Sequence, residues 1–322
     1  MFFLSGTGKK YREQRLCKKP DLPPFKEIAK KGKSDFVGAV TDGQFGAAAF
    51  DFKSVHDPLK ARKSWFFFDR EYVCLGTGIN SQAEFPVATT LNQCLLNKDV
   101  VVKSKGAKKT LDKGQHELKD VSWVLHDSIA YVFPSPASVN VSNATATGNW
   151  KLISHQASAS DETVKKDLFT LWFNHGQKPL SAGYSYIVIP KITPSAVESY
   201  TKKPEIAIIA NTVKMQAVQH KGLKLTEAVF YEPGTLKING TVAVTVGSPC
   251  IATVKMGAKG IEKIAVSDPT QKLKSIQLKV TTPVTGSGNN WSATWDKENK
   301  VSVIQIDLPA GGNAGKSAVL TL

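Results

Sequence analysis

The clearest pattern of apolar and polar positions along the chain lies at residues 64–78, SWFFFDREYVCLGTG. Trp65 and Phe67 alternate with Phe66 and Phe68, so an extended chain would carry aromatic rings on both faces. A strand that is apolar on both faces is typical of a position inside a sandwich or between layers. The charged Asp-Arg pair that follows Phe68 interrupts the apolar run and predicts a hairpin turn. We therefore expect two buried antiparallel strands here.

Similar strand-like runs recur along most of the chain, separated by clusters of Gly, Pro, Asn and Ser. Asp42-Gly43 is a strong hairpin signal between two of them. Residues 193–204 form a polar connector with a short helical pattern at 195–200. Beyond it, strand-like runs follow at roughly 8–12-residue spacing, which is typical of a small sandwich. These runs lie at 206–211, 215–220, 228–231, 241–246 and 250–255. The pattern predicts an all-β chain, with a large antiparallel β-sandwich followed by a smaller C-terminal β-sandwich.

Composition agrees with a globular protein of this kind. The 322 residues are enough for two domains, and 41% of them are hydrophobic. No apolar run approaches the roughly 20 residues that cross a bilayer, so no membrane partner is expected. Cys17, Cys74, Cys94 and Cys250 match no metal-binding spacing, and no cofactor is predicted. Cys74 and Cys94 lie in strand-like contexts and are expected to be buried thiols.

The formal net charge of +15 favours an anionic partner. The chain has no zinc-finger spacing, RNA-binding aromatic pattern or basic helix, so nucleic acid is not expected. An acidic polysaccharide such as a glycosaminoglycan is then the partner to consider. A solvated surface with no specific partner stays open as an alternative, and the oligomeric state is unknown. The densest basic segment predicts an exposed hairpin whose simplest role is a solvated loop. It holds Lys103, Lys105, Lys108, Lys109 and Lys113, with Gly106 and Gly114 beside them.

Two histidines are candidates for contact with a carbohydrate. His126 precedes Asp127, but adjacent residues of a strand point to opposite faces, so this pair cannot act jointly. We expect His126 to make a turn hydrogen bond instead. His175 lies at a polar Asn-His-Gly loop tip and could face a sugar if that loop rims a groove. No catalytic, cofactor-binding or metal-binding residue is assigned.

Four motifs carry a resemblance to a known family: SWFFFD at 64–69, LHDSIAYVFP at 125–134, GNW at 148–150 and LWFNHG at 171–176. Together they resemble polysaccharide lyase family 8, which includes chondroitin AC, hyaluronate and xanthan lyases. The resemblance extends over about 20–322. It implies descent from secreted or periplasmic enzymes that cleave uronic-acid polysaccharides, here of the chondroitin or hyaluronan type, by β-elimination.

In that family these motifs lie well downstream of the helical toroid that supplies the catalytic Asn, His, Tyr and Arg. The resemblance therefore implies a lyase fragment in which the catalytic helical domain is missing, and it leaves open whether the chain is an enzyme. Two other functions also stay open. One is a non-catalytic carbohydrate-binding β-sandwich protein, and the other is an inactive pseudogene product.

Residues 1–19 look unlike the rest of the chain. One permitted back-translation, read two bases later, gives VFPVWDWEKVPGTTALQK, which resembles the family motif FPVWDW-x-K-I/V-P-G-T-T. We therefore expect residues 1–19 to be out of frame or disordered, to pack poorly and to add no strand. They contain no apolar signal-peptide segment, which predicts a cytoplasmic location for the chain as written.

The predicted organisation beyond residue 19 has three parts. Residues 20–192 form the truncated central sandwich, 193–204 the linker and 205–322 the C-terminal sandwich. Because strands upstream of residue 20 would be missing, we expect an uncovered apolar face near Phe36, Phe45 and Phe50. Such a face would promote association.

Overall fold

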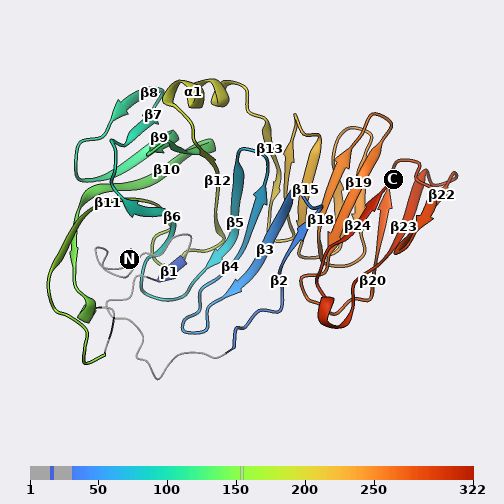
Figure 1. Cartoon of the computed structure of the whole chain (residues 1–322), viewed down its shortest axis with the longest axis horizontal. Coiled ribbons are helices and arrows are strands. Elements are labelled where there is room, and N and C mark those ends of the chain that lie inside the picture. Colours follow the sequence, from blue (N-terminus) through green and yellow to red (C-terminus); the bar gives the residue numbers. More distant parts are fainter. Residues whose placement is uncertain (1–14, 18–30, 153, 155) are drawn as a thin grey trace. The chain divides into compact units, whose positions relative to one another are not determined.

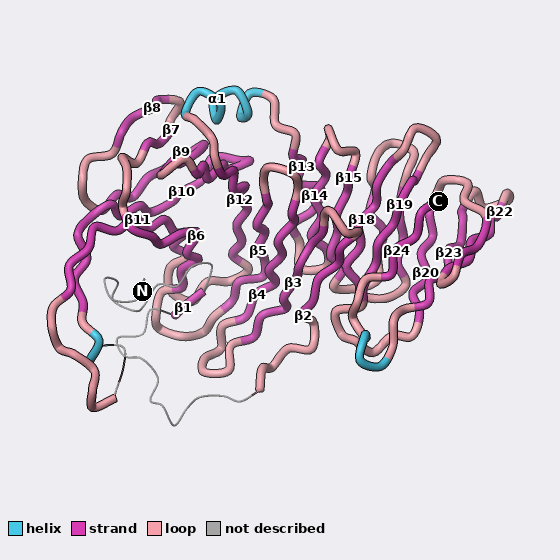
Figure 2. The backbone as a smooth tube through the Cα atoms, viewed as in Figure 1, coloured by secondary structure: helices cyan, strands magenta, loops and turns pink. Residues whose placement is uncertain are grey.

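The structure is a computed structural model that describes residues 15–17, 31–152, 154 and 156–322. Nearly all of its regular elements are strands, which confirms the all-β class (Figure 2). The described chain divides into two compact units. Unit 1 holds the first strand, Lys53–Lys60 and Ile79–Thr201, and unit 2 holds Lys33–Phe52, Ala61–Gly78 and Lys202–Leu322. Among the described residues, no helix has the length and apolar character needed to span a membrane.

Unit 1 is built on antiparallel strands in the order β1-β6-β11-β10-β12 (Figure 1). A smaller arm branches from β10, because β9 pairs with β10, β7 with β9, and β8 with β7. Helix α1, Pro194–Lys202, confirms the helix expected at 195–200. The strands are β1 Arg15–Cys17, β6 Val87–Leu95, β7 Val101–Ser104, β8 Ala107–Thr110, β9 Gln115–His126, β10 Ile129–Gly148, β11 Val164–Asn174 and β12 Ala182–Pro190.

Strand β1 corrects the expectation that residues 1–19 add no strand. Arg15 pairs with Thr89 and Cys17 with Val87, so β1 lies beside β6 in an antiparallel ladder. Backbone pairing of this kind needs only extended residues with free N–H and C=O groups, and an unusual side-chain sequence does not prevent it. The rest of the prediction for residues 1–19 falls on 1–14 and 18–19, which lie outside the described residues.

Strand β10 is 20 residues long and pairs with β9, β11 and β12. Its first residues pair with β9 and β12, and its last residues pair with β11. Pro134 and Pro136 lie where the ladder to β9 shifts register, between Val132 and Val139. Proline has no N–H to donate, so it is tolerated at such an irregularity, which also bends the strand. The bend allows a single strand to join two sets of partners.

Unit 2 contains three layers of strands. Covering strands β2 to β5 pair in sequence order, a central sheet has the order β13-β14-β15-β18-β19-β24, and an outer sheet has the order β16-β17-β20-β23-β22-β21. The covering strands are β2 Val37–Thr41, β3 Gly46–Lys53, β4 Lys60–Phe67 and β5 Tyr72–Asn80. The central strands are β13 Ile206–Asn211, β14 Met215–His220, β15 Leu225–Phe230, β18 Cys250–Met256, β19 Ile261–Ser267 and β24 Ala318–Thr321. The outer strands are β16 Gly234–Lys237, β17 Ala243–Val246, β20 Ser275–Val280, β21 Gly286–Gly288, β22 Trp291–Asp296 and β23 Val301–Asp307.

The central sheet packs on both of its faces. One face shares an apolar core with the outer sheet, to which Phe230, Ile264 and Ile304 contribute. The other face meets the covering strands, because the Phe36 ring lies 4.9 Å from the Tyr231 ring and the Thr41 N–H donates to Ser317 Oγ at 2.9 Å. Residues 33–52 and 61–78 therefore belong to the same compact unit as the strands after residue 202.

Several local predictions can be compared with this arrangement. The Asp42-Gly43 hairpin is confirmed, with Asp42 Oδ1 accepting from the Phe45 N–H at 2.8 Å. The turn after Phe68 is also confirmed, since the Phe68 N–H donates to the Glu71 carbonyl at 3.0 Å. The expectation that both faces of the SWFFFD strand are buried is wrong for Phe67, whose side chain is 45% exposed, whereas Phe66 is fully buried.

The uncovered apolar face expected near the start of the sandwich is not found at the described residues Phe36, Phe45 and Phe50. Phe36 and Phe45 are buried, with exposed fractions of 7% and 8%. Phe50 is half-buried and packs against Phe52, with ring centroids 5.6 Å apart. The sequence pattern could not show this cover, because the Tyr231 ring that packs on Phe36 comes from far along the chain.

Candidate functional site

His126 is the last residue of β9, and it lies in the interior of unit 1. Its imidazole is 2% exposed and stacks on the Phe169 ring, with centroids 4.4 Å apart and planes 22° apart. Its Nδ1 lies 3.7 Å from Cys94 Sγ. In the part of the chain that the structure describes, Nε2 of His126 has no hydrogen-bond partner. The turn hydrogen bond expected for His126 is therefore wrong, because the side chain points inward.

The environment of His126 favours the neutral imidazole. Burial lowers its pKa below the usual value, the nearby Asp127 carboxylate works in the opposite direction, and Lys98 lowers it slightly further. A neutral ring stacked on Phe169 suits an apolar interior. The same burial argues against direct contact between His126 and a sugar.

Asp127 lies on the solvent side of the same hairpin. Asp127 and Ser128 both have left-handed backbone conformations, with φ of 48° and 63°, and they form the two-residue turn between β9 and β10. The Asn97 side-chain amide donates to Asp127 at 3.1 Å, and this bond is the main reason that the Asp127 pKa is lowered. His126 and Asp127 therefore face different surroundings, as expected of adjacent residues.

His175 follows β11 in a short loop and is partly exposed. Its Nε2 lies 2.8 Å from Thr89 Oγ1, and its ring centroid lies 6.4 Å from those of Phe173 and Tyr184. The Gly176 N–H donates to Asn174 Oδ1, which fixes the loop tip. Of the two candidate histidines, His175 is the one that an external ligand can reach.

The sequence patterns did not predict the polar cluster that lies beside His126. The Asn92 amide donates to Tyr131 Oη at 2.5 Å, and Asn92 and Tyr131 are 3% and 1% exposed. Cys94 is half-buried beside them, whereas Cys74 is buried as predicted. One feature of the sequence could have indicated this cluster: an asparagine directly follows the apolar Leu91 in a strand-like run. A side-chain amide is buried in a strand only where it has a hydrogen-bond partner.

Unit 2 also buries two acids that the sequence did not single out. Glu227 lies in the middle of β15, and burial, with the Asp42 carboxylate adding to it, raises its pKa well above the usual range. Asp268, between β19 and β20, accepts from the N–H groups of Thr270, Lys272 and Leu273. Burial alone would raise the Asp268 pKa, but these donors outweigh burial and lower it.

The described residues contain no group of three or more His, Cys, Asp and Glu side chains that could hold a metal ion. Within that part of the chain, the three cysteines whose side chains are described are free thiols. Burial raises the pKa of the Cys250 thiol to about 12, so this thiol stays protonated and unreactive at neutral pH. We therefore assign structural roles to the buried polar groups around His126 and in unit 2.

The fold is that of the β-region of a polysaccharide lyase. The chain superposes on a solved chondroitinase AC lyase with a TM-score of 0.84 and 33% sequence identity, covering 99% of this chain and 44% of that one. A solved xanthan lyase from Paenibacillus gives a TM-score of 0.83 at 26% identity, covering 97% of this chain and 30% of that one.

The chain belongs to polysaccharide lyase family 8. The family model of the super-sandwich domain matches residues 2–201, and that of the C-terminal beta-sandwich domain matches residues 207–277. Among curated proteins, Chondroitinase-AC of Pedobacter heparinus is 37% identical over 304 residues, which are 93% of this chain and 40% of that protein. Xanthan lyase of a Bacillus species is 33% identical over 240 residues, 71% of this chain and 25% of that protein. The chain therefore spans less than half the length of these relatives.

Proposed function

We propose that this chain supplies the β-domains of an enzyme that cleaves uronic-acid glycosaminoglycans, of the chondroitin or hyaluronan type, by β-elimination. In this proposal the catalytic groups are not among its residues. The observation that carries the proposal is the 37% identity to Chondroitinase-AC, which extends over 93% of this chain but only 40% of that protein. Domains this similar over their whole length are expected to keep the same structural role.

The chemistry of β-elimination supports a non-catalytic role for the described residues. The reaction needs a base for the C5 proton, an acid for the leaving oxygen and a group that neutralises the uronate carboxylate. His126 is enclosed by Phe169, and His175 is bonded to Thr89. Glu227, the acid with the raised pKa, is fully buried in β15. These groups lie on separate elements and do not converge on a reacting atom.

His175 has a place in this proposal as a sugar contact. Its ring packs beside the buried rings of Tyr184 and Phe173, which hold the imidazole at the loop. The partly exposed imidazole would offer a hydrogen-bonding group to a sugar hydroxyl. His175→Ala should then weaken carbohydrate binding without unfolding unit 1.

A chimaera tests the proposed function. In it, the matching region of Chondroitinase-AC is replaced by this chain, and release of unsaturated uronate from chondroitin sulfate is followed by its absorbance. We expect the chimaera to be active and the chain alone to release no product. A chimaera that folds, melts cooperatively and has no activity would overturn the proposal, as would turnover by the chain alone.

The second candidate function is carbohydrate binding without any lyase partner. A lysine-lined hollow in unit 1 favours carbohydrate binding as an additional property of the chain. If the chain binds chondroitin sulfate while the folded chimaera is inactive, this second function is the one to retain.

A further inference from the structure

The lysine-rich hairpin of unit 1 forms as predicted, but its lysines differ in their partners. Lys105 and Gly106 form the β7–β8 turn, with φ of 50° and 75°. Lys103 donates to Glu198 at 2.6 Å and Lys113 to Asp167 at 2.7 Å, so both are neutralised locally. Within the described residues, Lys105 and Lys109 form no ion pair and are exposed.

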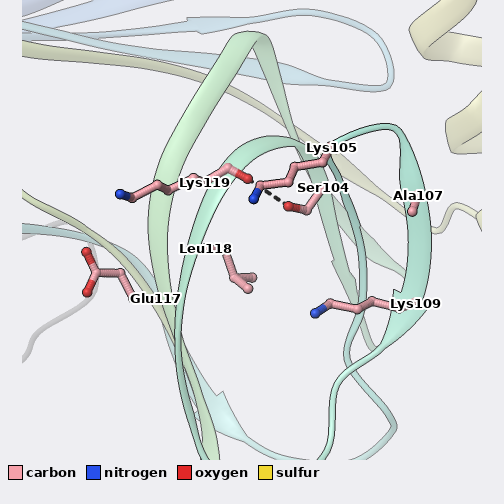
Figure 3. Close-up of a pocket in the computed structure, with 7 residues that line it drawn as sticks. All are labelled: Ser104, Lys105, Ala107, Lys109, Glu117, Leu118 and Lys119. Atoms are coloured by element: carbon pink, nitrogen blue, oxygen red, sulfur yellow. Dashed lines mark hydrogen bonds between the residues drawn. The ribbon is translucent and has the colours of Figure 1, made fainter.

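These unpaired lysines border a hollow of about 570 Å³. Figure 3 shows the Lys105 and Lys109 side chains reaching toward the space beside Leu118, while the Glu117 and Lys119 side chains point away from it. Ser104 Oγ donates to the Lys119 carbonyl at 2.7 Å, which ties the β7 side of the hollow to β9. The lining residues are Ser104, Lys105, Ala107, Lys109, Glu117, Leu118 and Lys119. Lys105 and Lys109 are the charged side chains that reach into the hollow, so its local charge is positive.

We propose that this hollow is a binding site for an anionic polysaccharide, with Lys105 and Lys109 holding a sulfate or carboxylate group. Lysine ammonium groups are compact charges on flexible stems, which suits anionic groups spaced along a chain. Leu118 is 8% exposed and offers an apolar floor for the C–H face of a sugar ring. The choice of a glycosaminoglycan as the polysaccharide rests on the proposed function.

The lining favours a polysaccharide over a nucleic acid. Single-stranded nucleic acids are held by aromatic rings or arginines that stack on the bases, in addition to positive charge. None of the seven described lining residues is aromatic or an arginine. The hollow therefore offers charge and a small apolar floor, without a stacking platform.

A second hollow in unit 1 provides a matched comparison. It has a volume of about 450 Å³ and is lined by Leu95, Leu96, Asn97, Thr145, Lys165, Lys166 and Asp167. Hydrogen bonds from Lys113 and Thr145 lower the Asp167 pKa, and Asp167 forms an ion pair with Lys113. An anion entering this hollow would meet a carboxylate beside the two lysines, which makes it the weaker site of the two.

The test compares two double variants of the full chain that lose the same number of charges. Lys105→Gln with Lys109→Gln alters the proposed site, and Lys165→Gln with Lys166→Gln alters the second hollow. All four lysines are exposed, so both variants should fold, which a thermal melt checks. Binding of chondroitin sulfate and hyaluronan oligosaccharides is measured by calorimetry at low ionic strength and again at high ionic strength.

We expect the first double variant to bind chondroitin sulfate about tenfold more weakly at low ionic strength, and the second to change little. If the first double variant also binds hyaluronan more weakly, a carboxylate group is sufficient for binding at this site. Equal losses in both variants would overturn the proposal, because the attraction would then be unspecific. So would equal binding of a single-stranded DNA oligonucleotide, or no binding by the wild-type chain. The activity of the chimaera is measured independently of this binding, so the proposed function and the proposed binding site can fail separately.

Discussion

The central and outer sheets of unit 2 share one core but differ in what covers their other face. All six residues of β15 in the central sheet are buried, whereas β23 in the outer sheet alternates between buried and partly exposed positions. The covering strands account for this difference, since Phe36 packs against Tyr231 beside the central sheet. A strand that is buried on both faces thus indicates a third layer of strands. Strict alternation of buried and exposed residues indicates a sheet that is covered on one face only.

The buried acids of unit 2 extend the comparison. Glu227 lies inside the doubly covered strand β15, and burial is the main cause of its raised pKa. Asp268 lies where the chain passes from the central to the outer sheet and ionises because several N–H groups point at it. Burial alone does not determine whether the pKa of an acid is raised or lowered, because hydrogen-bond donors that point at the carboxylate can outweigh burial.

The largest expected effect comes from the core that the two sheets share. Phe230→Ala in β15 should lower the free energy of unfolding by about 3–5 kcal/mol, because Phe230 is 1% exposed and its loss leaves a cavity. Gln277→Ala, on the exposed face of β20, should change it by less than about 0.5 kcal/mol. Urea denaturation of both variants measures this. Similar losses for both would mean that the core shared by the two sheets contributes no more than the exposed face of the outer sheet.

The connection between the two sheets should give the next largest effect. Asp268→Ala should cost about 2–3 kcal/mol, because the N–H groups of Thr270, Lys272 and Leu273 lose a shared charged acceptor inside the protein. Since the folded pKa of Asp268 is lowered, its contribution is present above pH 4 and is lost as the pH falls through the folded pKa.

Asp296 serves as the control for this prediction. It accepts from the N–H groups of Glu298 and Asn299 in an exposed turn, where water can replace it. Asp296→Ala should therefore cost less than Asp268→Ala. Thermal melts from pH 3 to pH 7 test both statements, and acid sensitivity unchanged by Asp268→Ala would contradict the assignment.

The smallest effect is expected at Glu227, with the opposite dependence on pH. The folded pKa is raised, so the wild-type loses stability as the pH rises above the ordinary glutamate value. Glu227→Gln removes this loss and should be more stable than wild-type by about 1 kcal/mol at pH 8, with little difference at pH 4. Glu262→Gln, exposed on β19, is the matched control for the substitution itself. A Glu227→Gln variant less stable than wild-type at pH 8 would indicate a charged, hydrogen-bonded Glu227.

Local patterns in the sequence predicted much of the fold. Asp42-Gly43 and the lysine hairpin around Gly106 were found because their turns depend on neighbouring residues alone. The length of β10 was not foreseen, since Pro134 and Pro136 normally end a strand and are tolerated here only at a bulge. The third layer of unit 2 was not foreseen either, because it joins segments far apart in the sequence.

The candidate site was predicted only in part. The position of His175 at a loop tip follows from its Asn-His-Gly context. The inward position of His126 does not, because the two-residue turn begins one position later than expected, at Asp127. A shift of one residue moves a strand side chain to the opposite face, so this small error changed His126 from a turn residue into a core residue.

The covering strands have a consequence for the order in which the chain is made. Thr41 of β2 bonds to Ser317, which lies 276 residues later. At a synthesis rate of roughly 5–20 residues per second, β2 is made about 14–55 s before that partner. During this interval Phe36 and Val40 lack the central sheet that buries them in the finished protein. Chaperones that hold exposed apolar segments would therefore find a long-lived target in β2 of the nascent chain.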